Sequence, residues 1–273
     1  MMKSKQILTT PYTLSIRLGA DGFSFSVHDP LDYATFSYYP LEIEPGISLT
    51  ANMRRLLASN EMLQGNFKRV DVLLDTSAYT TVPFELFEDE QAECIYEHCL
   101  PLRRGECVLY DIMDRSNAVV LYAMDRTAYQ LLSEYYPEFH LYATVTPVIE
   151  HLANKNRVSG TRRLYLRIHG KSVSLVAFER SHLLMGVTYS CYNVEDIAYY
   201  VMNAWSGMGF NPETDELYIV GEEDRKQEVA ERLQRFLNKV AVVTPVAEFN
   251  RSTPARMENL PYDMLTLIHG NLL

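Results

Sequence analysis

One hairpin pattern occurs twice in this 273-residue chain. Residues 14–27 read LSIRLGADGFSFSV, and residues 164–177 read LYLRIHGKSVSLVA. In both, apolar and polar residues alternate up to a glycine-containing turn and again after it, which is the pattern of two antiparallel strands. The first strand of each hairpin also carries an arginine at the equivalent position, Arg17 in the first and Arg167 in the second. A repeat of this kind predicts a fold built from two similar halves.

Each hairpin continues in a similar way. A third strand-like segment follows at 34–39 in the first half and at 183–189 in the second. Apolar residues spaced three and four apart then predict a helix at about 49–63 and another at about 194–205, the second with Asn193 as its N-cap. We therefore expect three antiparallel strands and a helix at the start of both halves.

Later landmarks support the duplication and indicate an insertion. VVLYAMDR (119–126) resembles ELYIVGEEDR (216–225), and TPVIE (146–150) resembles TPVAE (244–248). The arginines that end the first pair of segments lie 99 residues apart, and the prolines of the second pair lie 98 apart. The hairpin arginines Arg17 and Arg167 lie 150 apart. The difference of about 51 residues indicates that the first half holds about 51 residues that the second half lacks. We assign them to a small α/β insertion at about 77–117.

This spacing divides the chain at about its middle. The first half is expected at 1–154 and the second at 155–273, with a closing helix at about 260–271. An apolar fraction of 47% over this length is sufficient for two ordinary hydrophobic cores or one large one.

Charge and hydrophobicity exclude several classes of protein. The chain has 25 Lys and Arg against 35 Asp and Glu, a net charge of −10, so nucleic acid is not an expected partner. No stretch reaches the roughly 18 apolar residues of a membrane span. The start, MMKSKQILTTPY, lacks the apolar region of a signal peptide. We expect a cytoplasmic protein with reduced cysteines.

Short motifs with known chemistry are missing from the sequence. Cys94, His98 and Cys99 fall on one predicted helix, but no CxxC pair accompanies them, so we expect buried thiols and not a zinc site. There is no HExxH, GxSxG, GxxxxGK[ST] or GxGxxG. Metalloprotease, serine hydrolase, P-loop and dinucleotide-binding functions therefore have no support.

Two copies of three antiparallel strands, helix, strand, helix, strand, helix resemble the actin-like superfamily, which includes sugar kinases and the ATPase half of heat-shock chaperones. An insertion entered through Val82-Pro83 and the ending LPYDMLTLIHGNL (260–272) are similar to its pilus-assembly and cell-division members. The pattern also resembles a bacterial family with this fold and no assigned activity. The resemblance implies a duplicated ribonuclease-H-like α/β fold, two βββαβαβα halves with an insertion in the first.

Active members of that superfamily carry Asp-x-Gly at the end of the first strand of each half. The aspartate holds Mg²⁺ and the turn amides cradle phosphate. On this chain the first aspartate corresponds to Arg17, with Gly19 kept. The second corresponds to Arg167, with His169 in place of a glycine and Gly170 after it.

The adenosine motif, normally a strand followed by two glycines, falls on VGEED, which keeps Gly221 and continues with Glu222. Arginine offers donors and no acceptor and stays protonated, so it cannot bind Mg²⁺. Asp21 is the neighbouring acid that could replace a lost carboxylate. The resemblance, with these departures, implies that the chain keeps the actin-like fold but does not catalyse phosphoryl transfer. We expect no catalytic residue, no metal site, and no ATP or magnesium cofactor.

Arg17 and Arg167 are expected to face each other across the cleft between the halves. They either hold a small anion through their planar guanidinium groups or pair with acidic residues and fix the strand ends. For the anion reading, the candidate cleft residues are the following: Arg17, Gly19, Asp21, Arg167, His169, Gly170, Lys171, Gly221 and Glu222.

Two functions follow from these alternatives. We favour a non-catalytic scaffold or adaptor that binds a protein partner or itself, because the resemblance to pilus-assembly and cell-division proteins implies such a role. The alternative is a nucleotide- or small-anion-binding protein that uses the cleft, including a weak ATPase. Tyrosine pairs such as Tyr38-Tyr39 and Tyr199-Tyr200 suit either a partner surface or half-buried packing.

Overall fold

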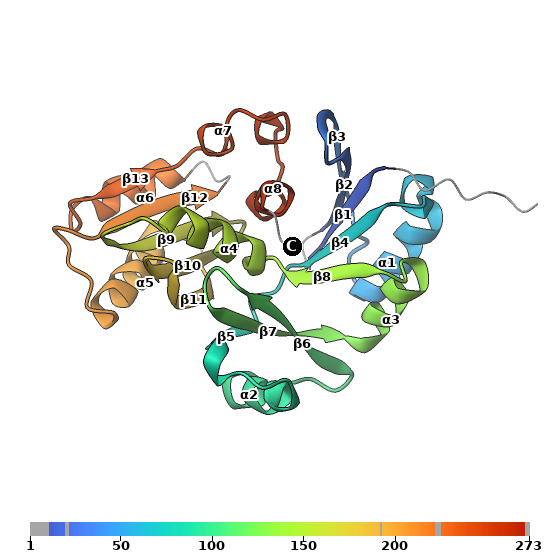
Figure 1. Ribbon diagram of the computed structural model, residues 1–273, viewed down its shortest axis with the longest axis horizontal. Coiled ribbons are helices and arrows are strands. Elements are labelled where there is room, and N and C mark those ends of the chain that lie inside the picture. The colour runs from blue at the N-terminus through green and yellow to red at the C-terminus, as the bar shows by residue number, and fades with distance from the viewer. Residues whose placement is uncertain (1–10, 20–21, 192, 222–224, 271–273) are drawn as a thin grey trace, which may run out of the picture.

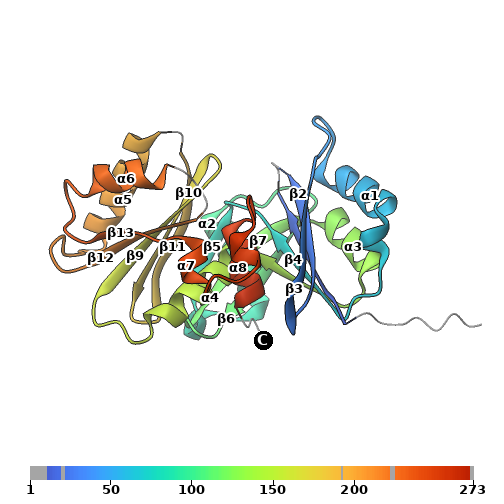
Figure 2. The same ribbon diagram turned by 90° about the horizontal axis from the view of Figure 1, so that it is seen from above.

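The computed structural model describes residues 11–19, 22–191, 193–221 and 225–270 (Figure 1). Two five-stranded sheets stand on opposite sides of the molecule, and helices α4 (Val145–Asn156) and α8 (Tyr262–His269) lie between them (Figure 2). A third, three-stranded sheet lies at the lower side in Figure 1. The expected α/β class is confirmed.

The first half is built on a mixed sheet with the strand order β3-β2-β1-β4-β8. Its strands are β1 (Thr13–Leu18), β2 (Phe23–Asp29), β3 (Asp32–Leu41), β4 (Arg69–Leu74) and β8 (Phe139–Ala143). β1 pairs antiparallel with β2 and parallel with β4, so the first hairpin supplies the centre of the sheet. Helices α1 (Leu49–Ser59) and α3 (Arg126–Tyr135) cover its outer face (Figure 2).

The second half repeats this plan with the strand order β11-β10-β9-β12-β13. Its elements are β9 (Arg162–His169), β10 (Ser172–Glu179), β11 (His182–Ser190), α5 (Val194–Gly207), β12 (Glu216–Gly221), α6 (Lys226–Leu233), β13 (Val240–Val242) and α7 (Pro245–Glu248). β9 takes the place of β1, β12 that of β4, and β13 that of β8. The predicted duplication, two βββαβαβα halves, is confirmed.

A small unit between β4 and α3 has no counterpart among the described residues of the second half. It consists of β5 (Tyr79–Pro83), α2 (Ala92–Cys99), β6 (Glu106–Met113) and β7 (Ala118–Asp125), with the strand order β5-β7-β6. The small sheet extends past residue 117, where we expected the insertion to end. The matching of 119–126 with 216–225 is therefore wrong, because β7 belongs to the insertion. Both segments are apolar strands that lead into a helix, and this shared context produced the match.

One continuous hydrophobic core joins the two halves. It contains Leu14 and Ile16 of the first sheet, α4, α8, and residues such as Tyr165 and Val220 on the inner face of the second sheet. The outer face of the second sheet packs separately against α5 and α6. α8 is buried over most of its length, as expected of a helix inside a core. The expected division between residues 154 and 155 falls within α4.

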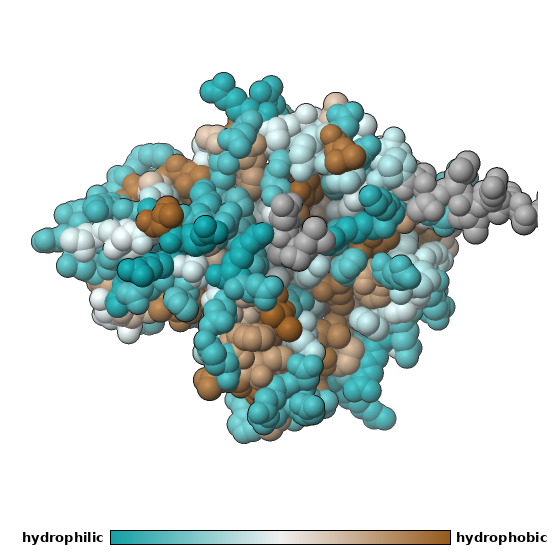
Figure 3. All heavy atoms as spheres, viewed as in Figure 1, coloured by the Kyte–Doolittle hydropathy of each residue, from teal (hydrophilic) through white to brown (hydrophobic). Residues whose placement is uncertain are grey.

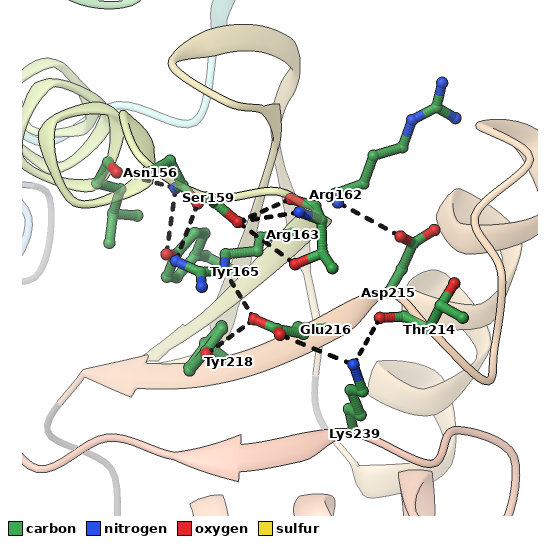
Figure 4. A network of polar contacts seen from close by, with 12 residues as sticks. Asn156, Ser159, Arg162, Arg163, Tyr165, Thr214, Asp215, Glu216, Tyr218 and Lys239 are labelled. Carbon is green, nitrogen blue, oxygen red and sulfur yellow. Dashed lines mark hydrogen bonds and ion pairs between the residues drawn. The ribbon is translucent and has the colours of Figure 1, made fainter.

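A polar network fixes the start of the second sheet to the end of α4 (Figure 4). Arg163 Nε donates to Glu216 Oε2 at 2.8 Å, and the Tyr218 hydroxyl donates to the same oxygen at 2.9 Å. Asn156 Nδ2 donates to the Tyr165 hydroxyl at 3.1 Å. The rings of Tyr165 and Tyr218 stack with their centroids 5.4 Å apart. These contacts anchor the end of β9 that lies away from Arg167.

The cysteines of α2 do not lie where we expected them. Cys94 and Cys99 are exposed, because Ala92 and Tyr96 form the buried side of this helix. The expectation of buried thiols at these two positions is wrong.

Among the residues that the structure describes, no three His, Cys, Asp or Glu side chains are grouped so as to hold a metal. No helix in the described ranges is long and apolar enough to cross a membrane.

Candidate functional site

The two repeated arginines occupy equivalent positions near the ends of β1 and β9. Arg17 lies opposite Ser24 in the first hairpin, and Arg167 lies opposite Ser174 in the second. The Arg17 side chain is 11% exposed and that of Arg167 is 3% exposed. A buried guanidinium group needs a carboxylate or another strong acceptor because its charge has lost its water. Its neighbours therefore decide its role.

Asp263 of α8 lies between the two arginines and pairs with both. Arg17 Nε donates to Oδ1 at 3.1 Å and to Oδ2 at 3.2 Å, and Arg167 Nη2 donates to Oδ2 at 2.7 Å. The Asp263 side chain is fully buried. Because Arg17 belongs to the first sheet and Arg167 to the second, one carboxylate from the closing helix links the two halves.

Asp75 adds a second carboxylate to this cluster. Its Oδ2 accepts a hydrogen bond from Arg17 Nη2 at 2.8 Å, and its Oδ1 accepts one from the Thr144 hydroxyl at 3.2 Å. Its backbone amide donates to the carbonyl of Leu18 at 2.7 Å. Among the described residues, two guanidinium groups and two carboxylates thus form a charge cluster in which the opposite charges balance. This balance removes much of the attraction that two arginines alone would exert on a phosphate.

Asp263 stays ionised at physiological pH. Burial alone would raise the pKa of Asp263, but the charges and hydrogen bonds of Arg17 and Arg167 hold it below its usual value. Burial, together with the charge of Arg167, lowers the pKa of the adjacent His169 to about 3. The His169 ring is therefore neutral, and its Nε2 is hydrogen-bonded to Ser174 Oγ at 2.9 Å.

The glycines kept from the superfamily motifs have structural roles here. The amide of Gly19 donates to the carbonyl of Gly22 at 2.9 Å, within its own turn. Gly221 has a φ of +103°, and a Cβ at this position would lie 2.9 Å from the carbonyl oxygen of Ile168. Glycine therefore lets the end of β12 lie close against β9.

A pocket of about 510 Å³ opens beside the charge cluster, between the halves. It is lined by Asp75, Thr76, Ser77, Thr144, Val145, Arg167, His169, Gly170, Lys171, Ser172, Ser174 and Thr188. Six of these twelve residues carry hydroxyl groups. The Thr188 hydroxyl is hydrogen-bonded to Ser174 Oγ at 2.8 Å and to the Tyr79 hydroxyl at 3.1 Å, which connects the pocket to the insertion.

The structure brings together part of the predicted anion site. The members that line the pocket are Arg167, His169, Gly170 and Lys171. Arg17 belongs to the charge cluster, and Gly19 and Gly221 are not among the lining residues. Asp21 and Glu222 lie outside the described residues. Anion binding at this site stays a prediction.

Sequence reasoning missed Asp263 and Asp75. Asp263 is the sole acid in the apolar ending 260–272, and a carboxylate inside a buried helix requires a cationic partner. That signal, combined with the two arginines, was sufficient to suggest the pairing. Asp75 follows directly on β4, at the end of a sheet strand where ligand-binding residues gather in α/β folds.

Comparison with known proteins places the fold in a wider group. The profile of a family described as "Protein of unknown function (DUF3822)" matches residues 3–240. A Bacteroides thetaiotaomicron crystal structure, of a protein with an actin-like ATPase fold and unknown function, has a TM-score of 0.81 and 31% identity, covering 98% of this chain and 99% of that one. A structure of the PilM-PilN type IV pilus biogenesis complex has a TM-score of 0.52 and 14% identity, covering 94% of each chain. No functionally curated protein matches the sequence.

These matches confirm the predicted resemblance to the actin-like superfamily and to a family without an assigned activity. The likeness to the pilus protein shows a shared fold alone.

Proposed function

This chain belongs to the DUF3822 family of proteins of unknown function, and we propose that it is a non-catalytic actin-like scaffold or adaptor. In this proposal, the cleft that binds nucleotide in active members of the superfamily holds the two halves together here. The protein works by binding a protein partner or a second copy of itself. It acts in the cytoplasm without ATP, metal ion or catalytic residue.

The position of Asp263 is the observation that best supports this proposal. In active members of the superfamily, carboxylates stand where this chain has Arg17 and Arg167. Here a protein carboxylate balances both guanidinium groups, at distances of 2.7 to 3.2 Å. A nucleotide phosphate that reached these guanidinium groups would have to displace Asp263, whose buried carboxylate would then lose both of its arginine partners. Breaking a buried ion pair costs about 3–5 kcal/mol, which opposes nucleotide binding.

Thermal unfolding in the presence of ATP, ADP and Mg²⁺ tests the proposal. A nucleotide present at 100 times its Kd would stabilise the protein by about 2.7 kcal/mol, which corresponds to a rise in Tm of about 5–10 °C. We expect no such rise, and no release of phosphate from ATP. A magnesium-dependent rise in Tm would overturn the proposal.

A second candidate is a protein that binds a small anion in the cleft pocket. Lys171 and the hydroxyl groups of the pocket favour it. Inorganic phosphate and sulfate in the same thermal assay test this candidate. This candidate would be supported if phosphate or sulfate raises the Tm of the wild type but not that of Lys171→Ala. The control variant Lys68→Ala, at an exposed position outside the pocket, should keep the rise in Tm. Equal shifts in both variants would indicate a general salt effect.

A further inference from the structure

The insertion carries a group of large apolar side chains that are exposed to solvent. These are Phe84, Leu86, Tyr110 and Ile112, which we call the insertion patch, with exposures of 45%, 71%, 36% and 50%. Single exposed apolar residues are ordinary on protein surfaces, whereas several together mark an interaction site. Apolar residues are visible in the lower part of the molecule in Figure 3, where Figure 1 places the insertion.

The insertion patch arises because α2 covers part of the small sheet. Tyr96 of α2 packs on the middle of the sheet, against Val119 and its neighbours, and Val108 of β6 is partly covered. Further along the same face of β6, Tyr110 and Ile112 are exposed. β6 is an edge strand of the small sheet, paired with β7.

The loop before α2 reaches the same surface. The ring of Phe87 lies 4.8 Å from that of Tyr110, so the loop that carries Phe84 and Leu86 contacts β6 at Phe87. Edge strands of monomeric proteins are usually protected by lysine, proline or a covering element. On the face of β6 that α2 leaves uncovered, the exposed residues are tyrosine and isoleucine, which suits a surface that a partner covers.

The loop and helix beside the insertion patch, residues 84–97, are acidic. No Lys or Arg occurs between Arg69 and Arg103. This stretch contains six exposed acids, of which Asp89 and Glu90 lie near Tyr110: Glu85, Glu88, Asp89, Glu90, Glu93 and Glu97. A hydrogen bond to Asp89 raises the pKa of the Tyr110 hydroxyl, so this acid directly adjoins the patch. The surface therefore complements a partner that is both apolar and positively charged.

We propose that the insertion patch is the docking site for an extended, basic segment of a partner protein that lies along β6. Apolar side chains of the segment cover Tyr110 and Ile112, while its Lys and Arg side chains pair with the surrounding acids. An extended segment beside an edge strand also gains main-chain hydrogen bonds. The inference rests on the proposed scaffold function and specifies the partner's chemistry.

The charge of the surface argues against a second copy as the occupant. A twofold dimer through the insertion patch would place the same surface against itself. The acids of residues 85–97 would then face the identical acids of the other copy, and like charges in an interface are unfavourable. A partner of opposite charge has no such cost.

Fluorescence anisotropy with the full chain and two labelled peptides tests the proposal. One peptide alternates valine and lysine, and the other alternates valine and glutamate. We expect the lysine peptide to bind, more weakly at high salt, and the glutamate peptide not to bind. The double variant Tyr110→Ser/Ile112→Ser should weaken binding at least about tenfold. Leu184→Ser, at an apolar residue with 43% exposure outside the insertion, should leave it unchanged.

Each result has a defined consequence. All substituted positions are exposed, and an unchanged Tm confirms that the variants fold. Absence of binding by the lysine peptide, or equal binding by the double variant, would overturn the insertion patch as this docking site. A dimer seen by light scattering and removed by Tyr110→Ser/Ile112→Ser would show that a second copy is the occupant. These outcomes leave the scaffold function open to its own test, since only magnesium-dependent nucleotide binding removes that function.

Discussion

Arg17, Arg167 and Asp263 depend on one another. Arg167 is buried and Arg17 is mostly buried, and the carboxylate that balances them comes from a helix far away in the sequence. Because Asp263 contacts arginines from both sheets, it stabilises the arrangement of the two halves as well as each strand end. Its effect on stability should therefore be much larger than that of a surface ion pair.

Asp263→Asn tests this dependence directly. The substitution keeps the shape of the side chain but removes the charge that balances two buried guanidinium groups. We expect the free energy of unfolding to fall by about 3–5 kcal/mol, measured by urea denaturation. Glu179→Gln is a suitable control, because Glu179 forms an ion pair with Arg162 at the surface and should change stability little. A fully stable Asp263→Asn variant would contradict the structural role.

Among the elements, the attachment of the insertion depends on Asp111 of β6. This buried carboxylate accepts hydrogen bonds from the Tyr122 hydroxyl at 3.0 Å, the Ala143 amide at 2.9 Å and the Thr146 hydroxyl. Burial raises the pKa of Asp111 to about 7, although these donors act in the opposite direction. The small sheet is thus joined to β8 and α4 through a carboxyl group that titrates near neutral pH.

This raised pKa predicts a pH dependence of stability. A carboxyl whose pKa is higher in the folded than in the unfolded chain stabilises the fold below about pH 4, and this contribution is lost as the pH rises through about 7. Asp111→Asn removes the titrating group, and its amide can donate to the Tyr122 hydroxyl, which also lies 3.3 Å from the Leu141 carbonyl. Relative to the wild type, the variant should gain about 2–4 kcal/mol between pH 4 and pH 8.

Urea denaturation of both proteins at several pH values measures this difference. Groups that titrate in both proteins, such as Glu150, cancel in the comparison. A difference in stability that stays constant between pH 4 and pH 8 would show that Asp111 is already ionised in the folded protein at low pH.

At the element scale, much of the fold follows from local patterns. The two hairpins and α5 were predicted because their alternation and capping are written locally, and Asn193 Oδ1 does accept the Asp196 amide at 2.8 Å. The placement of β7 was mistaken because a strand's sequence does not specify which sheet it joins. The pairing of Asp263 was missed for a similar reason: its partners lie 96 and 246 residues away, and the final fold brings them together.

At the scale of the whole molecule, the shared core decides how the halves behave. α4 and α8 lie between the two sheets (Figure 2) and belong to the core that joins them, and Asp263 of α8 pairs with an arginine from each sheet. Two units with separate cores could move or unfold independently, whereas these halves cannot separate without exposing a common interior. The cleft is therefore a poor candidate for a hinge.

Differential scanning calorimetry tests this view of the molecule. We expect one cooperative transition, with a calorimetric enthalpy equal to the van't Hoff enthalpy. Two resolved transitions, or a partly unfolded state that retains one half, would show that the halves are independent domains.

The place of Asp263 in the sequence has a consequence for synthesis on the ribosome. The ribosome adds Arg17 and Arg167 to the growing chain 246 and 96 residues before their shared carboxylate. Until α8 has emerged from the exit tunnel, burying both arginines lacks its main compensation. We therefore expect the two halves to close on each other only after α8 has emerged, late in the synthesis of the chain.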